Sequence, residues 1–260
     1  MAQGCLHFKI KYRKTDLTEN IMNWNGFECR EFTFDSHGAT VVIPHNRTEN
    51  PVLAVKTEYW NAFPEVEIEL LKKGFYLCFI ENDNRWGADA DLDRKAEFVK
   101  SVINEYGLSQ KCVPVGMSCG GLIAIKFAAK YPELVACLYI DAPVLNYMSC
   151  PCGFGIGNAC CEDFPEIFDS LGLKNVSELI CYTEMPMHKL PALVENRIPA
   201  VLVAGGADKT VPYEENGILL ERAYKANGID LEVYIKPDCA HHPHGLDDPK
   251  PIVDFIITHS

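Results

Sequence analysis

The chain has 260 residues, of which 48% are hydrophobic and 23% are charged, a composition typical of a globular domain. Its formal net charge of −12 leaves no excess of cations for contacts with nucleic-acid phosphates. No apolar run reaches the length of a membrane span, and the opening segment MAQGCLHFKIKYRK has no apolar core of signal-peptide length. We therefore expect a cytoplasmic protein without nucleic-acid or membrane partners, which could form a homo-oligomer.

The beginning of the chain alternates between apolar and polar residues, as antiparallel strands do. Strands are predicted at residues 8–12 (FKIKY), 30–34 (REFTF) and 39–44 (ATVVIP), with a turn at 36–38 (SHG). A shorter strand, PVLAV, follows at 51–55.

From this point continuous apolar segments alternate with amphipathic ones. Strands are predicted at 75–80, 112–116, 134–144, 198–206 and 231–237, and helices at 65–74, 89–107, 122–132, 214–228 and 248–259. This order predicts an α/β fold with a mostly parallel, twisted sheet covered by helices on both faces. The alternation stops in a Gly-, Cys- and Pro-containing stretch, so we expect a core of residues 1–142 and 196–260 with a cap or lid insertion at 143–195.

Ser118 lies between a predicted strand and a predicted helix, in the sequence VGMSCGG. The pattern Gly116-x-Ser118-x-Gly120 is that of a nucleophile elbow, in which small neighbours let the strand and the helix approach a strained serine. The alternative is a glycine-rich packing turn without chemistry.

A serine nucleophile requires a base and a carboxylate that orients the base. The segment after the last predicted strand offers His241, His242 and His244, of which we favour His241 as the base. Asp208 follows the preceding strand and gives the order Ser, Asp, His; Asp141 is the rival acid.

An oxyanion needs two N–H donors. We expect one to be the amide of Cys119, directly after the serine, and the other to come from the loop after residues 51–55. Thr57 is the favoured residue there, and Lys56 and Glu58 are the alternatives.

Four cysteines gather within the predicted insertion: Cys150, Cys152, Cys160 and Cys161. Their CxC and CC spacing fits a zinc site poorly. A metal site, a disulfide and ordinary loop thiols remain as alternatives, and ordinary thiols are favoured.

The chain resembles the α/β-hydrolase superfamily over nearly its whole length, and within it a group of bacterial esterase-like hydrolases associated with plant-glycan breakdown. The runs that carry this resemblance are GMSCGGL, DAPV, GFGIGN, VPYEEN and HHPHGLDDPKPIVDFI. It implies that the first histidine, His241, is the base. The chain departs from the group at Asp238-Cys239-Ala240, where Gly-x-Gly is usual, and at Ser149-Cys150, where Ser-Trp is common.

We therefore expect a serine esterase without a metal or other cofactor, acting through an acyl-enzyme on a small-molecule or carbohydrate ester. Substrate contacts are expected from Trp60, Trp86 and His242; Tyr59 and Tyr147 could add sugar-stacking walls, or all four aromatic residues could be ordinary core. Alternatives are a peptidase, amidase or thioesterase with the same triad, an inactive binding protein on this scaffold, and a metal-dependent role for the HHPH segment.

Overall fold

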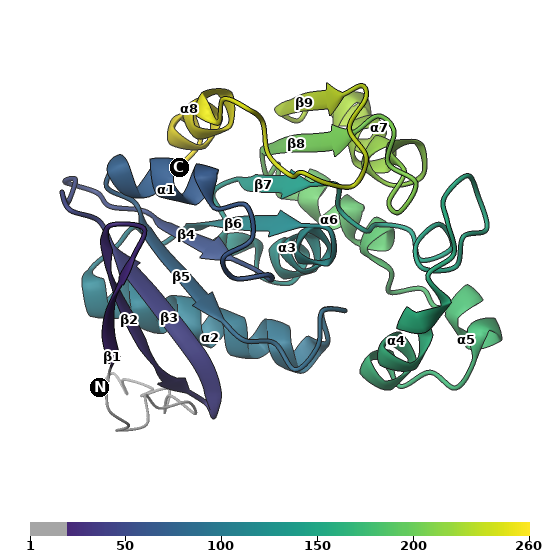
Figure 1. Cartoon of the computed structure of the whole chain (residues 1–260), viewed down its shortest axis with the longest axis horizontal. Coiled ribbons are helices and arrows are strands. Elements are labelled where there is room, and N and C mark those ends of the chain that lie inside the picture. The colour runs from purple at the N-terminus through teal and green to yellow at the C-terminus, as the bar shows by residue number, and fades with distance from the viewer. Residues whose placement is uncertain (1–19) are drawn as a thin grey trace, which may run out of the picture.

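The computed structural model describes residues 20–260, and these form a nine-stranded sheet with helices on both faces (Figure 1). The strand order is β1-β2-β3-β5-β4-β6-β7-β8-β9. The strand predicted at residues 8–12 lies outside the described residues.

The first strands form an antiparallel edge of the sheet, as the alternating sequence predicts. They are β1 (Asn20–Trp24), β2 (Phe27–Phe34) and β3 (His37–Ile43), and β3 pairs antiparallel with β5. The β2–β3 turn is made by Asp35 and Ser36, both with positive φ, one residue earlier than predicted. Two positive φ values are what a tight hairpin turn with the twist of its strands requires.

The remaining strands are parallel, which confirms the prediction of a mostly parallel sheet. They are β4 (Leu53–Lys56), β5 (Tyr76–Ile80), β6 (Cys112–Met117), β7 (Leu138–Asp141), β8 (Ala200–Gly205) and β9 (Leu231–Lys236). Their carboxyl ends share one edge of the sheet, where side chains from distant parts of the chain meet.

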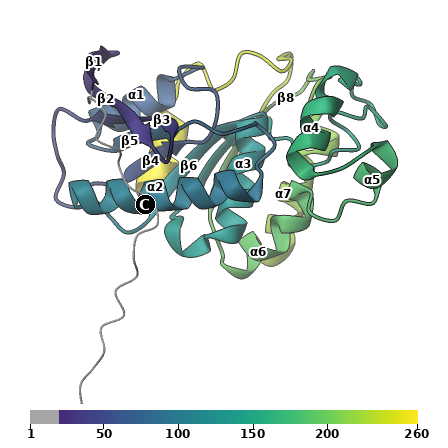
Figure 2. The same ribbon diagram turned by 90° about the horizontal axis from the view of Figure 1, so that it is seen from below.

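Helices bury both faces of this sheet (Figure 2). On one face, apolar residues of α1 (Glu65–Lys72) and α8 (Lys250–Thr258) pack with alternate strand residues. The other face is covered by α2 (Asp89–Tyr106), α3 (Cys119–Lys130), α6 (Leu190–Glu195) and α7 (Gly217–Asn227). Alternate residues of the central strands thus contribute to two apolar layers.

The segment 143–195 contains short helices and no strand. Its α4 (Phe164–Leu171) and α5 (Val176–Ile180) lie beyond the carboxyl ends of β6 and β7, to the right in Figure 1. α6, at the end of this segment, packs against α3 and α7.

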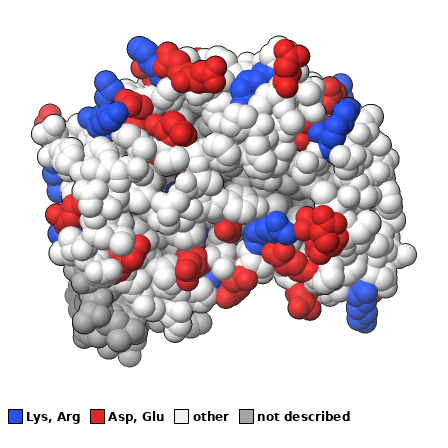
Figure 3. Space-filling view, in the orientation of Figure 1, with Lys and Arg blue, Asp and Glu red and all other residues white. Residues whose placement is uncertain are grey.

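The charged side chains on the face shown in Figure 3 form small groups of mixed sign around a broad uncharged area. Among residues 20–260, no helix combines the length and the apolar character needed to cross a membrane.

Candidate active site

Ser118 occupies a sharp turn between β6 and α3. Its backbone has φ 53° and ψ −119°, a region that a non-glycine residue adopts only under strain. The adjacent glycines make this turn possible: a Cβ on Gly116 would lie 2.2 Å from the Gly120 carbonyl oxygen, and one on Gly121 would lie 2.6 Å from Pro143 Cβ. The elbow predicted from the sequence is therefore present, and it holds the Ser118 side chain at the carboxyl edge of the sheet.

The structure brings Ser118, His241 and Asp208 together in one hydrogen-bonded chain. The Oγ atom of Ser118 lies 3.0 Å from Nε2 of His241, and Nδ1 of His241 lies 2.7 Å from Oδ2 of Asp208. His241 comes from the loop after β9 and Asp208 from the loop after β8. A base flanked by a hydroxyl and a carboxylate in this way can take the serine proton while its ring stays fixed.

Asp208 is buried, and both oxygens of its carboxylate have hydrogen-bond partners. Its Oδ1 atom accepts hydrogen bonds from the amides of Thr210 at 2.8 Å and Val211 at 2.9 Å. Burial alone would raise its pKa, but the hydrogen bond from His241 and those from the two amides outweigh burial, so the pKa lies below its ordinary value. The carboxylate therefore stays ionised beside the imidazole.

Asp141, the rival acid, pairs with a different histidine. Its Oδ1 atom lies 2.7 Å from Nδ1 of His244, and its Oδ2 atom accepts the Gly245 amide at 2.6 Å. Asp141 and His244 are both buried. Two parallel His–Asp pairs thus lie side by side, and the one that contacts Ser118 contains Asp208.

One of the two expected oxyanion donors fits its position. The amide of Cys119 lies at the N-terminus of α3 and has no hydrogen-bond partner within residues 20–260. Burial raises the pKa of the Cys119 thiol to about 12, so this thiol is protonated and is not a second nucleophile.

The expectation for Thr57 requires correction. Its amide donates to the Val115 carbonyl at 3.0 Å, because the ladder between β4 and β6 continues one residue past β4. Its hydroxyl lies 2.7 Å from the Gly120 carbonyl, to which it donates. Thr57 therefore ties the elbow to the neighbouring strand and has no amide hydrogen left for an oxyanion.

A cavity of about 340 Å³ opens in front of Ser118. His242, expected to contact substrate, lines it, as do Tyr59 and Cys119; Trp86 also belongs to its wall, but its side chain is fully buried. Trp60 does not: it stacks between Trp24 and Phe79, with ring centroids 5.2 and 5.5 Å away, and faces a different hollow. The loop after β4 turns its side chain toward the antiparallel strands, which corrects the expectation for Trp60.

Tyr147 is fully buried and meets Trp86 edge-on, with ring centroids 5.9 Å apart. It therefore supports the Trp86 ring within the core, and its own ring is not exposed in the cavity.

An ion pair at the cavity was not anticipated from the sequence. Arg85, in the loop after β5, lies 2.6 Å from Asp163 and 3.0 Å from Glu166 of α4. Both Arg85 and Asp163 line the cavity. The pair joins the core to the segment 143–195, and no local sequence pattern could have indicated so distant a contact.

In the described part of the chain every cysteine is a free thiol. Cys150 and Cys160 line the cavity and interact with each other, while Cys152 lies near Cys161. Burial, together with the neighbouring thiols and Asp163, raises the pKa of Cys150. No disulfide joins any of these four cysteines.

Comparisons with known proteins give matches at the level of structure. No family model matches the chain, and no curated protein matches it. It is similar to an acylaminoacyl peptidase of Pyrococcus horikoshii, with a TM-score of 0.64 and 14% identity over 83% of this chain and 37% of that one. A Bacteroides ovatus protein provisionally named a dipeptidyl aminopeptidase IV gives a TM-score of 0.64 and 13% identity over 90% of this chain and 35% of that one.

The chain thus spans little more than a third of the length of these structures. At such identities the likeness concerns the fold. Together with the strand order and the Ser118 elbow, it shows that the chain has the α/β-hydrolase fold.

Proposed function

We propose that the chain is a serine hydrolase that cleaves carboxylic esters through an acyl-enzyme on Ser118. The observation that carries this proposal is the continuous chain of hydrogen bonds from the Ser118 hydroxyl through His241 to the buried Asp208 carboxylate. That order of hydroxyl, imidazole and carboxylate is the one that converts an unreactive serine into a nucleophile.

The reaction proceeds in two acyl transfers. Ser118 Oγ attacks the carbonyl carbon while its proton passes to Nε2 of His241, and the carbonyl electron pair moves onto the oxygen. The intermediate then collapses: the bond to the leaving alcohol breaks and His241 protonates that alcohol. Water repeats the sequence on the acyl-enzyme, giving the carboxylic acid and free Ser118. Asp208 stabilises the imidazolium in both transfers.

The developing oxyanion needs donors beside Ser118. The Cys119 amide meets this need because it has no partner within residues 20–260 and lies at a helix N-terminus. For the second donor we assign the amide of Tyr59, a cavity-lining residue with positive φ in the loop after β4. Its hydrogen bond to the Glu58 carboxylate is 3.2 Å long and is easily exchanged for one to an oxyanion.

The size of the cavity favours a small substrate, since about 340 Å³ is near the lower end for ligand pockets. The resemblance of the sequence to glycan-associated esterases favours an acetyl or methyl ester of a sugar. Residues 143–195 act as a lid in this proposal, and the Arg85–Asp163 ion pair supports that role because it links the segment to the cavity.

A peptidase is the second candidate, because the two similar structures described above are an acylaminoacyl peptidase and a protein provisionally named a dipeptidyl aminopeptidase. The same triad hydrolyses esters and amides, so substrate range decides between them.

The test is a panel of nitrophenyl acetate, acetylated and methyl-esterified sugars, and aminoacyl nitroanilides. We expect turnover of the small esters, lost in Ser118→Ala, with little turnover of the anilides. Preferential cleavage of the anilides would favour the peptidase. Ester turnover that survives in Ser118→Ala would refute the assignment of the nucleophile.

A further inference from the structure

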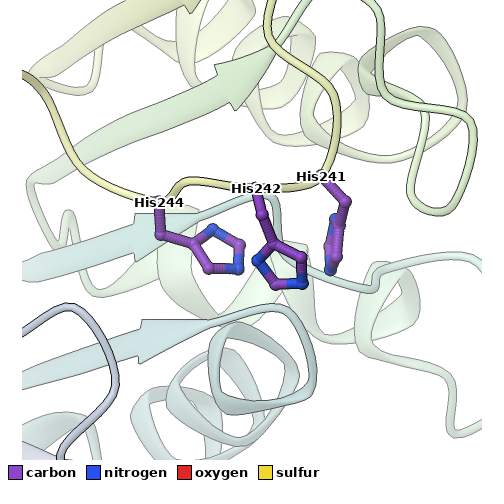
Figure 4. A group of neighbouring side chains, drawn as sticks. All are labelled: His241, His242 and His244. Atoms are coloured by element: carbon purple, nitrogen blue, oxygen red, sulfur yellow. The ribbon is translucent and has the colours of Figure 1, made fainter.

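Three imidazole rings lie side by side at the carboxyl edge of the sheet. Figure 4 shows His241, His242 and His244 projecting from the same side of the loop that follows β9. Their ring centroids are 4.8, 4.9 and 5.0 Å apart in pairs, and one potential ligand atom from each ring lies within 4.8 Å of the others. The proposed hydrolysis uses only the first of these rings, so the other two need an explanation.

His244 is held as metal-binding histidines are held. Its Nδ1 atom is 2.7 Å from the Asp141 carboxylate, whose second oxygen accepts the Gly245 amide, so Nε2 is the nitrogen left with a free lone pair. Both members of the pair are buried. A carboxylate behind the ring fixes its tautomer and orientation and makes it a better ligand.

His241 has the same arrangement, with Asp208 behind Nδ1 and its Nε2 atom on the Ser118 side. His242 is exposed, stacks on Phe63 with centroids 5.7 Å apart, and its ring has no hydrogen-bond partner within residues 20–260.

We propose that the three rings bind one divalent transition-metal ion such as Zn²⁺, and that the bound ion inhibits hydrolysis. Three histidines with a fourth position open to water are an established zinc ligand set. Nitrogen ligands at about 2.0–2.1 Å from Zn²⁺ lie closer together than 4.8 Å, so the rings must close on the ion; His242 can move because it is exposed.

Inhibition follows from the chemistry of one atom. The Nε2 lone pair of His241 accepts the Ser118 hydroxyl proton in the hydrolysis, and the same lone pair would coordinate the ion. One lone pair cannot serve both, so the metal-bound protein has no general base. The inference that the ion inhibits hydrolysis rests on the proposed function. The inference that the three rings bind the ion does not.

The experiment measures binding and activity separately on the full chain. Co²⁺ alone is titrated into Ser118→Ala, which lacks the nucleophile but keeps all three rings, and visible absorption reports a four-coordinate ion. We expect one Co²⁺ per chain, and loss of the absorption in the same background when His242→Ala or His244→Gln is added. His242 is exposed, so His242→Ala should fold. The test therefore remains valid if His244→Gln does not fold.

Asp141→Asn in the same background should weaken the Co²⁺ affinity about 10- to 100-fold, because it removes the carboxylate behind a ligand. Wild-type ester turnover should be inhibited by Zn²⁺ and restored by a chelator, and His242→Ala should be less sensitive to Zn²⁺ relative to its own metal-free rate.

Each contrary result has a distinct meaning. Absence of Co²⁺ binding, or a near-ultraviolet sulfur-to-cobalt band that places the ion on cysteines, overturns the site. Binding with Zn²⁺-insensitive turnover overturns the inhibition alone. Binding in a wild-type protein that hydrolyses nothing supports the site and refutes the proposed function, together with the inhibition that rests on it.

Discussion

The Oδ2 atom of Asp208 lies 2.7 Å from Nδ1 of His241, while the other oxygen of the carboxylate is held by two backbone amides. Ser118, the third partner, is 123 positions from His241 in the sequence, yet its hydroxyl lies 3.0 Å from the other nitrogen of the ring. The two His–Asp pairs at this edge differ in that only the Asp208 pair contacts Ser118.

The first prediction compares the two carboxylates. Asp208→Asn should reduce kcat about 10⁴-fold, because an amide favours the wrong imidazole tautomer and does not stabilise the imidazolium. Asp141→Asn should cost far less, since its partner His244 does not contact Ser118. Ester hydrolysis by the two purified variants checks this; the reverse ranking would assign the acid to Asp141.

The second prediction concerns the elbow glycines. Gly116→Ala should lower the free energy of unfolding by roughly 1–3 kcal/mol, the usual cost of overpacking. The reason is that the new Cβ would lie 2.2 Å from the backbone oxygen of Gly120. Gly120→Ala is the matched control: its Cβ would meet side-chain atoms no closer than 3.2 Å. Urea denaturation measures both, and equal losses would contradict the packing described for Gly116.

The third prediction separates the two tryptophans. Trp86→Phe should lower KM for bulkier esters, on the order of 10-fold, because a smaller ring at this fully buried position in the wall beside Ser118 enlarges the cavity. Trp60→Phe should leave KM unchanged and lower thermal stability, because its ring stacks on Trp24 and Phe79 away from that cavity. An effect of Trp60→Phe on KM equal to that of Trp86→Phe would refute this placement.

The fourth prediction concerns pH and the buried Lys95 of α2. Burial lowers its pKa to about 8, against 10.5 for an ordinary lysine, although Nζ donates to the Ile80 carbonyl at 3.2 Å. Between these two values the unfolded chain binds more protons than the folded one, so this group makes the protein more stable as the pH rises from about 8 to 10.5.

Lys95→Met should therefore gain stability relative to wild type at pH 7 and lose about 2 kcal/mol of that advantage by about pH 9.5. Urea denaturation at both values tests this, with exposed Lys72→Met as the control. A difference between wild type and Lys95→Met that is independent of pH would contradict the charge penalty.

Much of the site could be anticipated because it depends on local pattern and strand order. The elbow at Ser118 is recognisable from a short run of consecutive residues, because small residues flank a serine between a predicted strand and a predicted helix. Asp208 and His241 follow successive strands of a parallel sheet, whose carboxyl ends must meet at one edge. The sequence order alone therefore placed them near Ser118, although it could not choose among three histidines.

The two incorrect predictions concern Thr57 and Trp60. In each case the outcome depends on the exact end of a strand or on the direction of one side chain. Hydrogen bonding to β6 extends one residue past the end of β4, so the Thr57 amide donates to the Val115 carbonyl. The exact ends of strands are poorly determined by sequence. Trp60 lies just beyond that boundary, and only the packed Trp24 and Phe79 rings determine where it points. The Arg85–Asp163 and Asp141–His244 pairs join segments brought together by the whole fold, so no local pattern carries them.

The most direct measurement treats the wild-type protein with a fluorophosphonate and maps the adduct by peptide mass spectrometry. We expect one adduct, on Ser118, absent in Ser118→Ala and formed far more slowly in His241→Ala. A wild-type protein that stays unlabelled, or labelling on another residue at the wild-type rate, would contradict a nucleophilic Ser118 activated by His241.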